Sequence, residues 1–202
     1  MPSGIRTYPI KIVLLGSDEK SKKYVLDRLA HQKSLSYVYN SIGVEFAVSN
    51  IVYNSDILGK INVSLSIWML SSHPKWKRVR RIYYKKALIA IIVFSSNNPQ
   101  SFFDVSYWVN EYWSYVGRKL PVIVIEVSKN QSNELDEEAM VLVSRIREEN
   151  HGLAEYIKIL SDDQQIYDIL YKAVDMIFRY IAVRSEMKGR NTLQLFKNID
   201  KK

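Results

Sequence analysis

The sequence predicts an α/β domain built on a mostly parallel sheet. Continuous apolar runs at residues 10–15, 88–94 and 122–127 have the composition of buried parallel strands. Segments with apolar residues at helical spacing alternate with these runs, which is the pattern of strand, helix, strand units. The chain has 202 residues, of which 47% are hydrophobic and 25% charged. That length and composition suffice for one such domain with a full core.

The first half of the chain is expected to hold three strands and one helix. Residues 10–15 (IKIVLL) form the first strand, and residues 20–32 then carry apolar side chains at helical spacing. Further strands are expected at residues 44–53 and 61–69, because apolar and polar residues alternate there. The short polar segment between these two strands is typical of a turn.

The second half continues the alternation around a central strand at residues 88–94 (LIAIIVF). Pro99 is expected to open a helix that runs to residue 116 and is capped by Asn97 or Asn98. The remaining expected elements are a strand at 122–127, a helix at 134–149, a strand at 154–160 and a helix at 165–184. We therefore predict one domain at residues 1–184 and a basic polar tail at residues 185–202.

Composition excludes several classes of protein. The chain has no cysteine, so disulfides, thiolate metal sites and a prenylated cysteine are excluded. No run of about 18 uncharged apolar residues predicts a transmembrane segment. We expect a cytoplasmic location, with peripheral contact at a membrane as the alternative. The net charge of +8, concentrated at residues 75–86 and after residue 184, favours an acidic partner, anionic lipid or nucleic acid without choosing among them.

The segment after the first strand resembles a phosphate-binding loop. The P-loop signature is G-x-x-x-x-G-K-[ST], and residues 16–23 are GSDEKSKK. Gly16 and Lys22 match the first glycine and the lysine of that signature. Ser21 stands at the second glycine, and Lys23 stands at the serine or threonine.

Five later segments resemble Rab proteins of the Ras superfamily. They are SIGVEF at residues 41–46, IW at 67–68, YYKKA at 83–87, NPQSF at 98–102 and LPVIV at 120–124. Because their order and spacing also agree, the chain is similar to a small GTPase of the Rab type. The resemblance implies a P-loop small-GTPase fold, with a six-stranded, mostly parallel sheet flanked by about five helices.

The same resemblance supplies the candidates for nucleotide and phosphate binding. They are Gly16, Ser17, Ser21, Lys22, Lys23 and Ser41. Lys22 matches the lysine that pairs with the β- and γ-phosphates, a solvated lysine at a helix start being the alternative. Ser41 keeps the hydroxyl of the switch I threonine. Lys23 places an ammonium where the family has a magnesium ligand, which leaves open a phosphate site that works without magnesium.

Other family positions have changed as well. Met69 stands at the magnesium-binding aspartate, Ser72 at the glycine that senses the γ-phosphate, and His73 at the glutamine that orients water. We interpret His73 as a loop residue, the alternative being a group that orients water. Lys129 stands where an aspartate accepts hydrogen bonds from guanine. We therefore expect no catalytic residue, no metal site and no cofactor, with GTP or GDP bound without magnesium as the alternative.

These changes predict a Rab-like pseudo-GTPase, a protein-binding module or scaffold with little or no GTP binding or hydrolysis, rather than an enzyme. A divergent GTP-binding switch is the first alternative, and a basic adaptor for anionic membrane or nucleic acid is the second. The former switch regions and the basic helix supply the candidates for partner contact. They are Phe46, Trp68, Trp76, Arg78, Arg80, Arg81 and Tyr83. The alternative for that helix is one buried apolar stripe below a solvated basic face.

Overall fold

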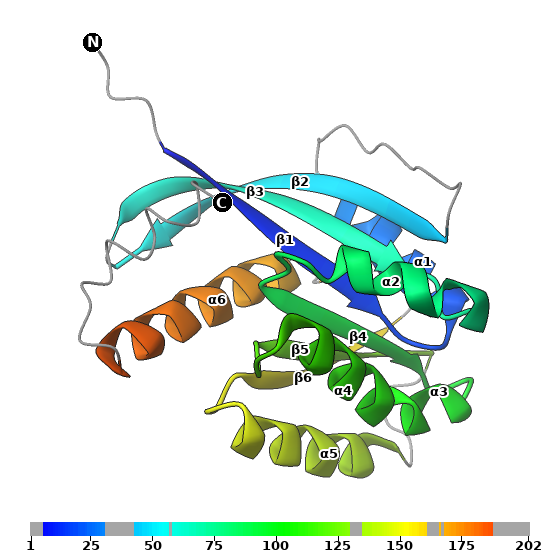
Figure 1. Ribbon diagram of the computed structural model, residues 1–202. Coiled ribbons are helices and arrows are strands. Elements are labelled where there is room, and N and C mark those ends of the chain that lie inside the picture. Colours follow the sequence, from blue (N-terminus) through cyan, green and yellow to red (C-terminus); the bar gives the residue numbers. More distant parts are fainter. Residues whose placement is uncertain are drawn as a thin grey trace.

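The computed structural model describes residues 6–30, 43–56, 58–129, 135–160, 166 and 168–187. Within these residues the chain forms one six-stranded sheet in the order β2-β3-β1-β4-β5-β6 (Figure 1). Strands β2 (Val44–Ser55) and β3 (Gly59–Leu70) form an antiparallel hairpin. All the other neighbouring strands pair in parallel, as predicted.

The parallel strands occupy the apolar runs of the sequence. They are β1 (Thr7–Leu15), β4 (Ile89–Ser95), β5 (Val122–Ser128) and β6 (Ala154–Leu160). Every residue of β4 and β5 is buried. Both faces of these strands are covered, which explains why their sequences are continuous apolar runs rather than alternating ones.

Helices cover both faces of the sheet. Helices α1 (Glu19–Ala30) and α6 (Asp168–Met187) pack on one face. The opposite face is covered by α2 (Lys77–Tyr83), α4 (Val105–Val116) and α5 (Leu135–Glu149), with the short α3 (Gln100–Phe103) beside them. A 3₁₀ turn, η1 (Pro74–Trp76), precedes α2. None of the helices in the described ranges is both long and apolar enough to cross a membrane.

Three local expectations were wrong. The single helix expected from Pro99 to residue 116 is broken at Asp104, between α3 and α4. Neither asparagine is the cap of α3: Pro99 holds that position without a side-chain hydrogen bond, and the Asn98 amide donates to Asp18 at 3.0 Å. The last helix, expected at residues 165–184, continues to Met187 as α6, where Ser185 is buried and its hydroxyl donates to the Ile181 carbonyl at 2.8 Å.

Gly16 brings the loop after β1 directly onto β4. Its φ is +135°, and a Cβ atom added there would lie 2.0 Å from the carbonyl oxygen of Val93. Only glycine permits this close approach of two backbones. The segment that follows Gly16 is thereby held at the carboxyl ends of β1 and β4.

Candidate functional site

The loop between β1 and α1 comprises only residues 16–18 and ends in a helix cap. The Asp18 carboxylate accepts a hydrogen bond from the Ser21 backbone nitrogen at 2.8 Å. The Lys22 backbone nitrogen donates to the Asp18 carbonyl at 3.0 Å. These bonds are those of a capped first turn of an α-helix. Part of the segment that resembles a phosphate loop is therefore helix.

Side chains from other elements anchor this loop. The Asn98 amide donates to the Asp18 carboxylate, the Ser17 hydroxyl donates to Asp104 at 2.5 Å, and the Trp108 indole donates to the Ser17 hydroxyl at 3.0 Å. Burial alone would raise the pKa of Asp18, but the hydrogen bonds from Asn98 and Ser21 hold it below its ordinary value. Asp18 is thus an ionised cap.

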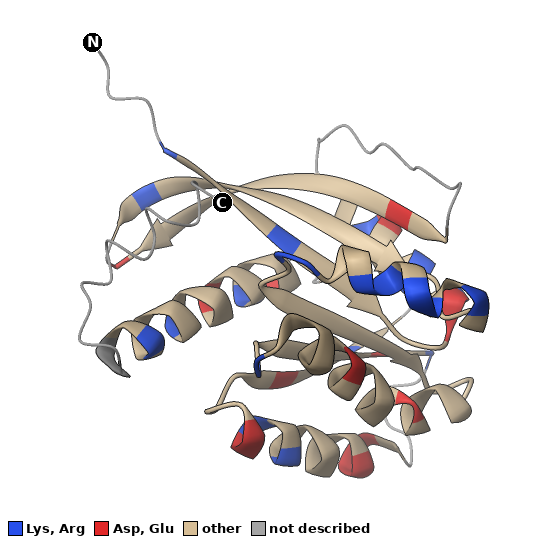
Figure 2. Cartoon of the chain, in the orientation of Figure 1, with Lys and Arg blue, Asp and Glu red and all other residues tan. Residues whose placement is uncertain are grey.

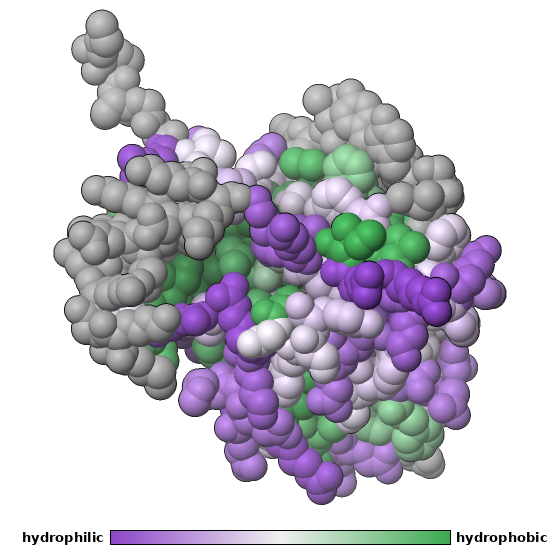
Figure 3. All heavy atoms as spheres, viewed as in Figure 1, coloured by the Kyte–Doolittle hydropathy of each residue, from purple (hydrophilic) through white to green (hydrophobic). Residues whose placement is uncertain are grey.

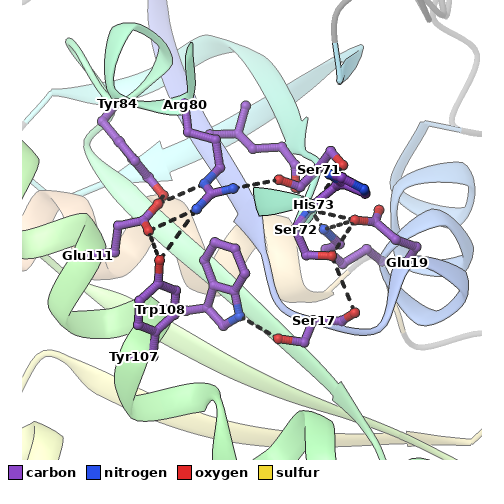
Figure 4. A network of polar contacts seen from close by, with 12 residues as sticks. Ser17, Glu19, Ser71, Ser72, His73, Arg80, Tyr84, Tyr107, Trp108 and Glu111 are labelled. Atoms are coloured by element: carbon purple, nitrogen blue, oxygen red, sulfur yellow. Dashed lines mark hydrogen bonds and ion pairs between the residues drawn. The ribbon is translucent and has the colours of Figure 1, made fainter. Parts of the chain in front are cut away.

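The Glu19 carboxylate joins α1 to the segment after β3 (Figure 4). One oxygen, Oε1, accepts from the Ser72 backbone nitrogen at 2.6 Å and from the Ser72 hydroxyl at 2.7 Å. The same oxygen lies 3.1 Å from the ammonium nitrogen of Lys22. That ammonium also donates to the Leu70 carbonyl at 2.7 Å. One carboxylate therefore gathers donors from two segments far apart in sequence.

Burial and charge both shift the pKa values of Glu19 and Lys22. Burial would raise the pKa of Glu19, but the Lys22 charge and the Ser72 hydrogen bonds hold it below its ordinary value. Lys22 is fully buried, and burial lowers its pKa to about 8 against the opposing attraction of Glu19. The solvated-lysine alternative for Lys22 is therefore wrong.

Lys23 and Met69 occupy two positions that the resemblance assigns to the metal. The Lys23 ammonium lies 2.9 Å from Asp27 and 2.8 Å from Glu45, so it links α1 to β2. Met69 is buried at the end of β3. Ser41, the remaining candidate, lies outside the described residues.

Trp76 and His73 shape the turn between β3 and α2. A Cβ atom at Gly43 would lie 2.5 Å from the Trp76 ring, so the indole covers Gly43 directly. The His73 ring nitrogen Nδ1 accepts from the Lys75 backbone nitrogen at 3.2 Å and caps η1. A polar hollow of about 320 Å³ remains beside Glu19, Glu45 and Trp76.

At the position that resembles the guanine site, side chains of the protein contact one another. Glu126 is fully buried in β5 and accepts a hydrogen bond from the Tyr156 hydroxyl. The Lys158 ammonium lies 3.8 Å from Glu126 and 2.7 Å from Asp136. Lys129 is exposed, and residues 130–134 lie outside the described ranges.

Three of the predicted partner residues form one aromatic cluster. The rings of Phe46 and Trp68 stack with their centroids 5.1 Å apart, and Trp68 lies 5.5 Å from Tyr83. The Lys11 ammonium sits 4.6 Å from the Trp68 centroid. The aromatic cluster, defined as Phe46, Trp68 and Tyr83, therefore combines residues from β2, β3 and α2 in one partly exposed surface.

Arg80 was predicted to lie on an exposed partner-binding face, and this prediction is wrong. It is 2% exposed, and its guanidinium binds both carboxylate oxygens of Glu111 on α4, at 2.8 and 2.9 Å. The hydroxyls of Tyr84 and Tyr107 donate to the same carboxylate (Figure 4). Arg78 and Arg81 are exposed.

Two residues of these networks were not among the predicted candidates. Glu19 precedes Lys22 by three residues on α1, which is the spacing of a helical ion pair, so its contact with Lys22 had a local signal. Its contact with Ser72, 53 residues away, had none. Glu111 lies within an aromatic stretch that predicts core packing, and a lone carboxylate there indicates a buried partner.

Comparison with known proteins places this fold in a family. A sequence model described as "Ras of Complex, Roc, domain of DAPkinase" matches residues 11–131, more than half of the chain. Ras-related protein Rab-5B of Plasmodium falciparum is 28% identical over 132 residues, which cover 65% of this chain and 62% of that protein. A probable Rab-related GTPase of Acanthamoeba polyphaga mimivirus is 29% identical over 101 residues, covering 50% of this chain and 45% of that protein.

The chain matches less than two thirds of the length of those two relatives. Mouse Ras-related protein Rab-19 is 23% identical over 192 residues, which cover 94% of this chain and 80% of that protein. The residues that the family model matches, 11–131, include the second half of β1, the loop at Gly16 and the segment after β3. The chain belongs to the Roc family of Ras-superfamily GTPase domains, with Rab proteins among its relatives.

Proposed function

We propose that the chain is a Rab-like pseudo-GTPase that works as a protein-binding module, with little or no GTP binding or hydrolysis. The observation that carries the proposal is the position of the Glu19 carboxylate. It accepts hydrogen bonds from the Lys22 ammonium and the Ser72 backbone nitrogen. In the family that this chain resembles, a γ-phosphate takes the bonds of the corresponding two groups. Glu19 thus acts as an internal substitute for that phosphate.

The helical turn at the start of α1 supports the same proposal. A phosphate loop needs backbone N–H groups that point at the ligand. Here the N–H groups of Ser21 and Lys22 are bonded to Asp18. A nucleotide would have to displace both these bonds and the carboxylate of Glu19.

The residues present do not fit magnesium at the position that the family implies. Magnesium prefers oxygen ligands in octahedral geometry. Lys23 offers an ammonium already paired with Asp27 and Glu45, and Met69 offers a thioether inside the core.

The aromatic cluster is the proposed surface for a protein partner. Its rings are partly exposed and lie against the Lys11 ammonium, an arrangement of apolar area and charge typical of binding surfaces. Figure 3 shows hydrophobic surface directly beside the hydrophilic band over α2. Because Glu19 holds Ser72 and Trp76 covers Gly43, this surface would keep one conformation without a nucleotide.

Two measurements test the proposal. Denaturing the purified protein and assaying released nucleotide, followed by titration with labelled GTP and GDP with and without magnesium, should show no stoichiometric nucleotide and no saturable binding at micromolar concentrations. Guanine-selective binding at micromolar concentration or tighter would overturn it.

The proposed role of the aromatic cluster in partner binding is tested separately, by comparing variants. A protein retained by the wild type should be lost from a Phe46→Ala, Tyr83→Ala double variant. It should be kept by Phe103→Ala, which removes a ring that is 63% exposed outside the aromatic cluster. Equal retention by all three proteins would refute the assigned surface.

A further inference from the structure

A second surface lies at the amino ends of the parallel strands, on the side of the sheet opposite the carboxyl ends that carry Gly16. The turn after α2 leads into β4, the turn after α4 leads into β5, and Leu153 precedes β6. Because β4, β5 and β6 are parallel, all three connections meet at the amino ends of the strands. Figure 2 shows basic segments in the first two of these connections.

Two hollows on this surface share Arg118. The first, of about 340 Å³, is lined by Arg81, Lys85, Lys86, Tyr115, Val116 and Arg118, among others. The second, of about 300 Å³, is lined by Arg118, Lys119, His151, Leu153, Val183 and Arg184, among others. We call the two together the Arg118 groove. Its continuity through one arginine suits an elongated ligand rather than a small one.

Part of the positive charge of the Arg118 groove is uncompensated within the described residues. No carboxylate lines either hollow among the described residues. Lys119 forms an exposed pair with Glu149 at 2.7 Å, a contact that can rearrange at little cost. Within the described ranges, no ion pair involves Arg81, Lys85 or Arg118.

Lys11 extends the positive charge toward the first hollow. Its ammonium donates to the Lys85 carbonyl at 3.3 Å. Burial and the nearby Lys86 charge both lower the pKa of Lys11, as expected where like charges gather. An anionic ligand at this edge would relieve that repulsion.

The floor of the groove distinguishes among anionic ligands. Val116 and Val183 line the two hollows and are partly exposed, so they supply apolar surface between the cations, whereas Ala87 and Leu153 are buried. Apolar surface between positive charges complements a peptide in which apolar side chains alternate with carboxylates.

Nucleic acid and membrane fit these features less well. Stacking of bases needs open ring faces, and each ring here already has one partner: Tyr115, which is 43% exposed, is stacked on Tyr84 at 5.4 Å, and Arg184 lies over Tyr180 at 5.8 Å. A bilayer presents a flat surface of headgroups, whereas these cations surround two recesses.

We propose that the Arg118 groove binds an acidic peptide segment of a protein partner, with carboxylates on Arg81, Lys85, Arg118 and Arg184 and apolar side chains on the floor between them. This site does not depend on the phosphate-loop region, so it can exist whether or not the chain binds nucleotide.

Fluorescence anisotropy with a labelled peptide of alternating glutamate and leucine tests the proposal on the full chain. Arg118→Glu and Lys85→Glu should each weaken binding by about tenfold or more, because each reverses a contacting charge. Lys60→Glu is the matched control: an exposed lysine at the start of β3, whose reversal should change affinity by less than about twofold. Far-ultraviolet circular dichroism would verify that the variants are folded.

Two further probes make the result decisive. A single-stranded oligonucleotide and vesicles of phosphatidylserine and phosphatidylcholine should bind more weakly than the peptide and lose less binding in Arg118→Glu. The proposal is overturned if the peptide does not bind, if Lys60→Glu weakens it as much as Arg118→Glu, or if the oligonucleotide or the vesicles bind more tightly through the same arginine.

Discussion

Arg80 and Glu111 form a two-point ion pair, with Nε to Oε1 at 2.8 Å and Nη2 to Oε2 at 2.9 Å. Their side chains are 2% and 4% exposed, and the carboxylate also accepts from the Tyr84 hydroxyl at 2.7 Å and from the Tyr107 hydroxyl. The pair joins α2 to α4. It explains how a helix with so many cations is fixed to α4.

Replacing one partner of this pair should be strongly destabilising. We expect Glu111→Ala to lower the free energy of unfolding by about 3 kcal/mol, because it leaves the Arg80 charge buried without its counter-ion. Chemical denaturation measures the change. Glu149→Ala, which removes an exposed carboxylate from Lys119, should cost less than about 1 kcal/mol. Equal losses in the two variants would contradict the structural role of the buried pair.

Removing the charge of Glu19 should loosen the segment after β3. In Glu19→Gln the side chain keeps its size but loses the ionised acceptor for Ser72 and Lys22. We expect amide hydrogen exchange at Ser72 to accelerate by about tenfold or more, since its protection depends on that acceptor. Glu45→Gln, which removes the carboxylate that Lys23 contacts, serves as the control and should leave Ser72 unaffected. Unchanged exchange in Glu19→Gln would show that other contacts hold the segment.

The buried Lys22 should make stability depend on alkaline pH. Its pKa is lowered from an ordinary value of 10.5 to about 8, so in this interval the unfolded chain binds more protons than the folded chain. The free energy of unfolding should therefore rise between pH of about 8 and about 10.5 relative to a Lys22→Met variant. Tyrosines titrate in both proteins and cancel in the difference. A difference that is flat or falls with pH would refute the lowered pKa.

Gly16 and Gly59 both have a positive φ, but only at Gly16 would an added Cβ atom clash with another strand. Comparing alanine variants at the two positions therefore distinguishes the cost of backbone strain from the cost of a steric clash. A Cβ atom at Gly16 would meet the Val93 carbonyl oxygen at 2.0 Å, whereas one at Gly59 would meet nothing within 4 Å. Gly59→Ala should cost about 1 kcal/mol through its backbone conformation alone. Gly16→Ala should cost at least about 2 kcal/mol more or abolish soluble expression, because two strands would have to separate. Thermal and chemical unfolding would compare the two, and similar stabilities would contradict the close approach.

Much of the fold was predictable because its signals are local. The apolar runs that became β4 and β5 lie within a residue of their expected positions, since strands buried on both faces leave continuous apolar sequence. The break at Asp104 was not predictable. It depends on contacts of its carboxylate and of Trp108 with Ser17, about 90 residues earlier in the chain.

In the candidate site, too, features with a local sequence signal were predictable and features set by long-range contacts were not. That Lys22 follows Gly16 at the spacing of a phosphate loop is visible in the sequence. That its ammonium is enclosed between Glu19 and the Leu70 carbonyl is not, because the Leu70 carbonyl is brought there by the pairing of β3 with β1. Arg80 was misassigned for a similar reason. Its sequence neighbours are exposed cations, and only packing against α4 identifies it as the buried member.

The capped first turn of α1 has a consequence for any attempt to restore the phosphate-loop motif by substitution. Restoring glycine at position 21 and serine at position 23 would return two letters of the motif, yet Asp18 would still cap the helix and Trp108 would still hold Ser17. Under the proposed function, a variant that changes only these two positions should not gain nucleotide binding, because the main chain of residues 16–22 would keep its present bonds. A nucleotide-binding variant would then require redesign of residues 16–22 as a unit, together with the α4 surface that supports them.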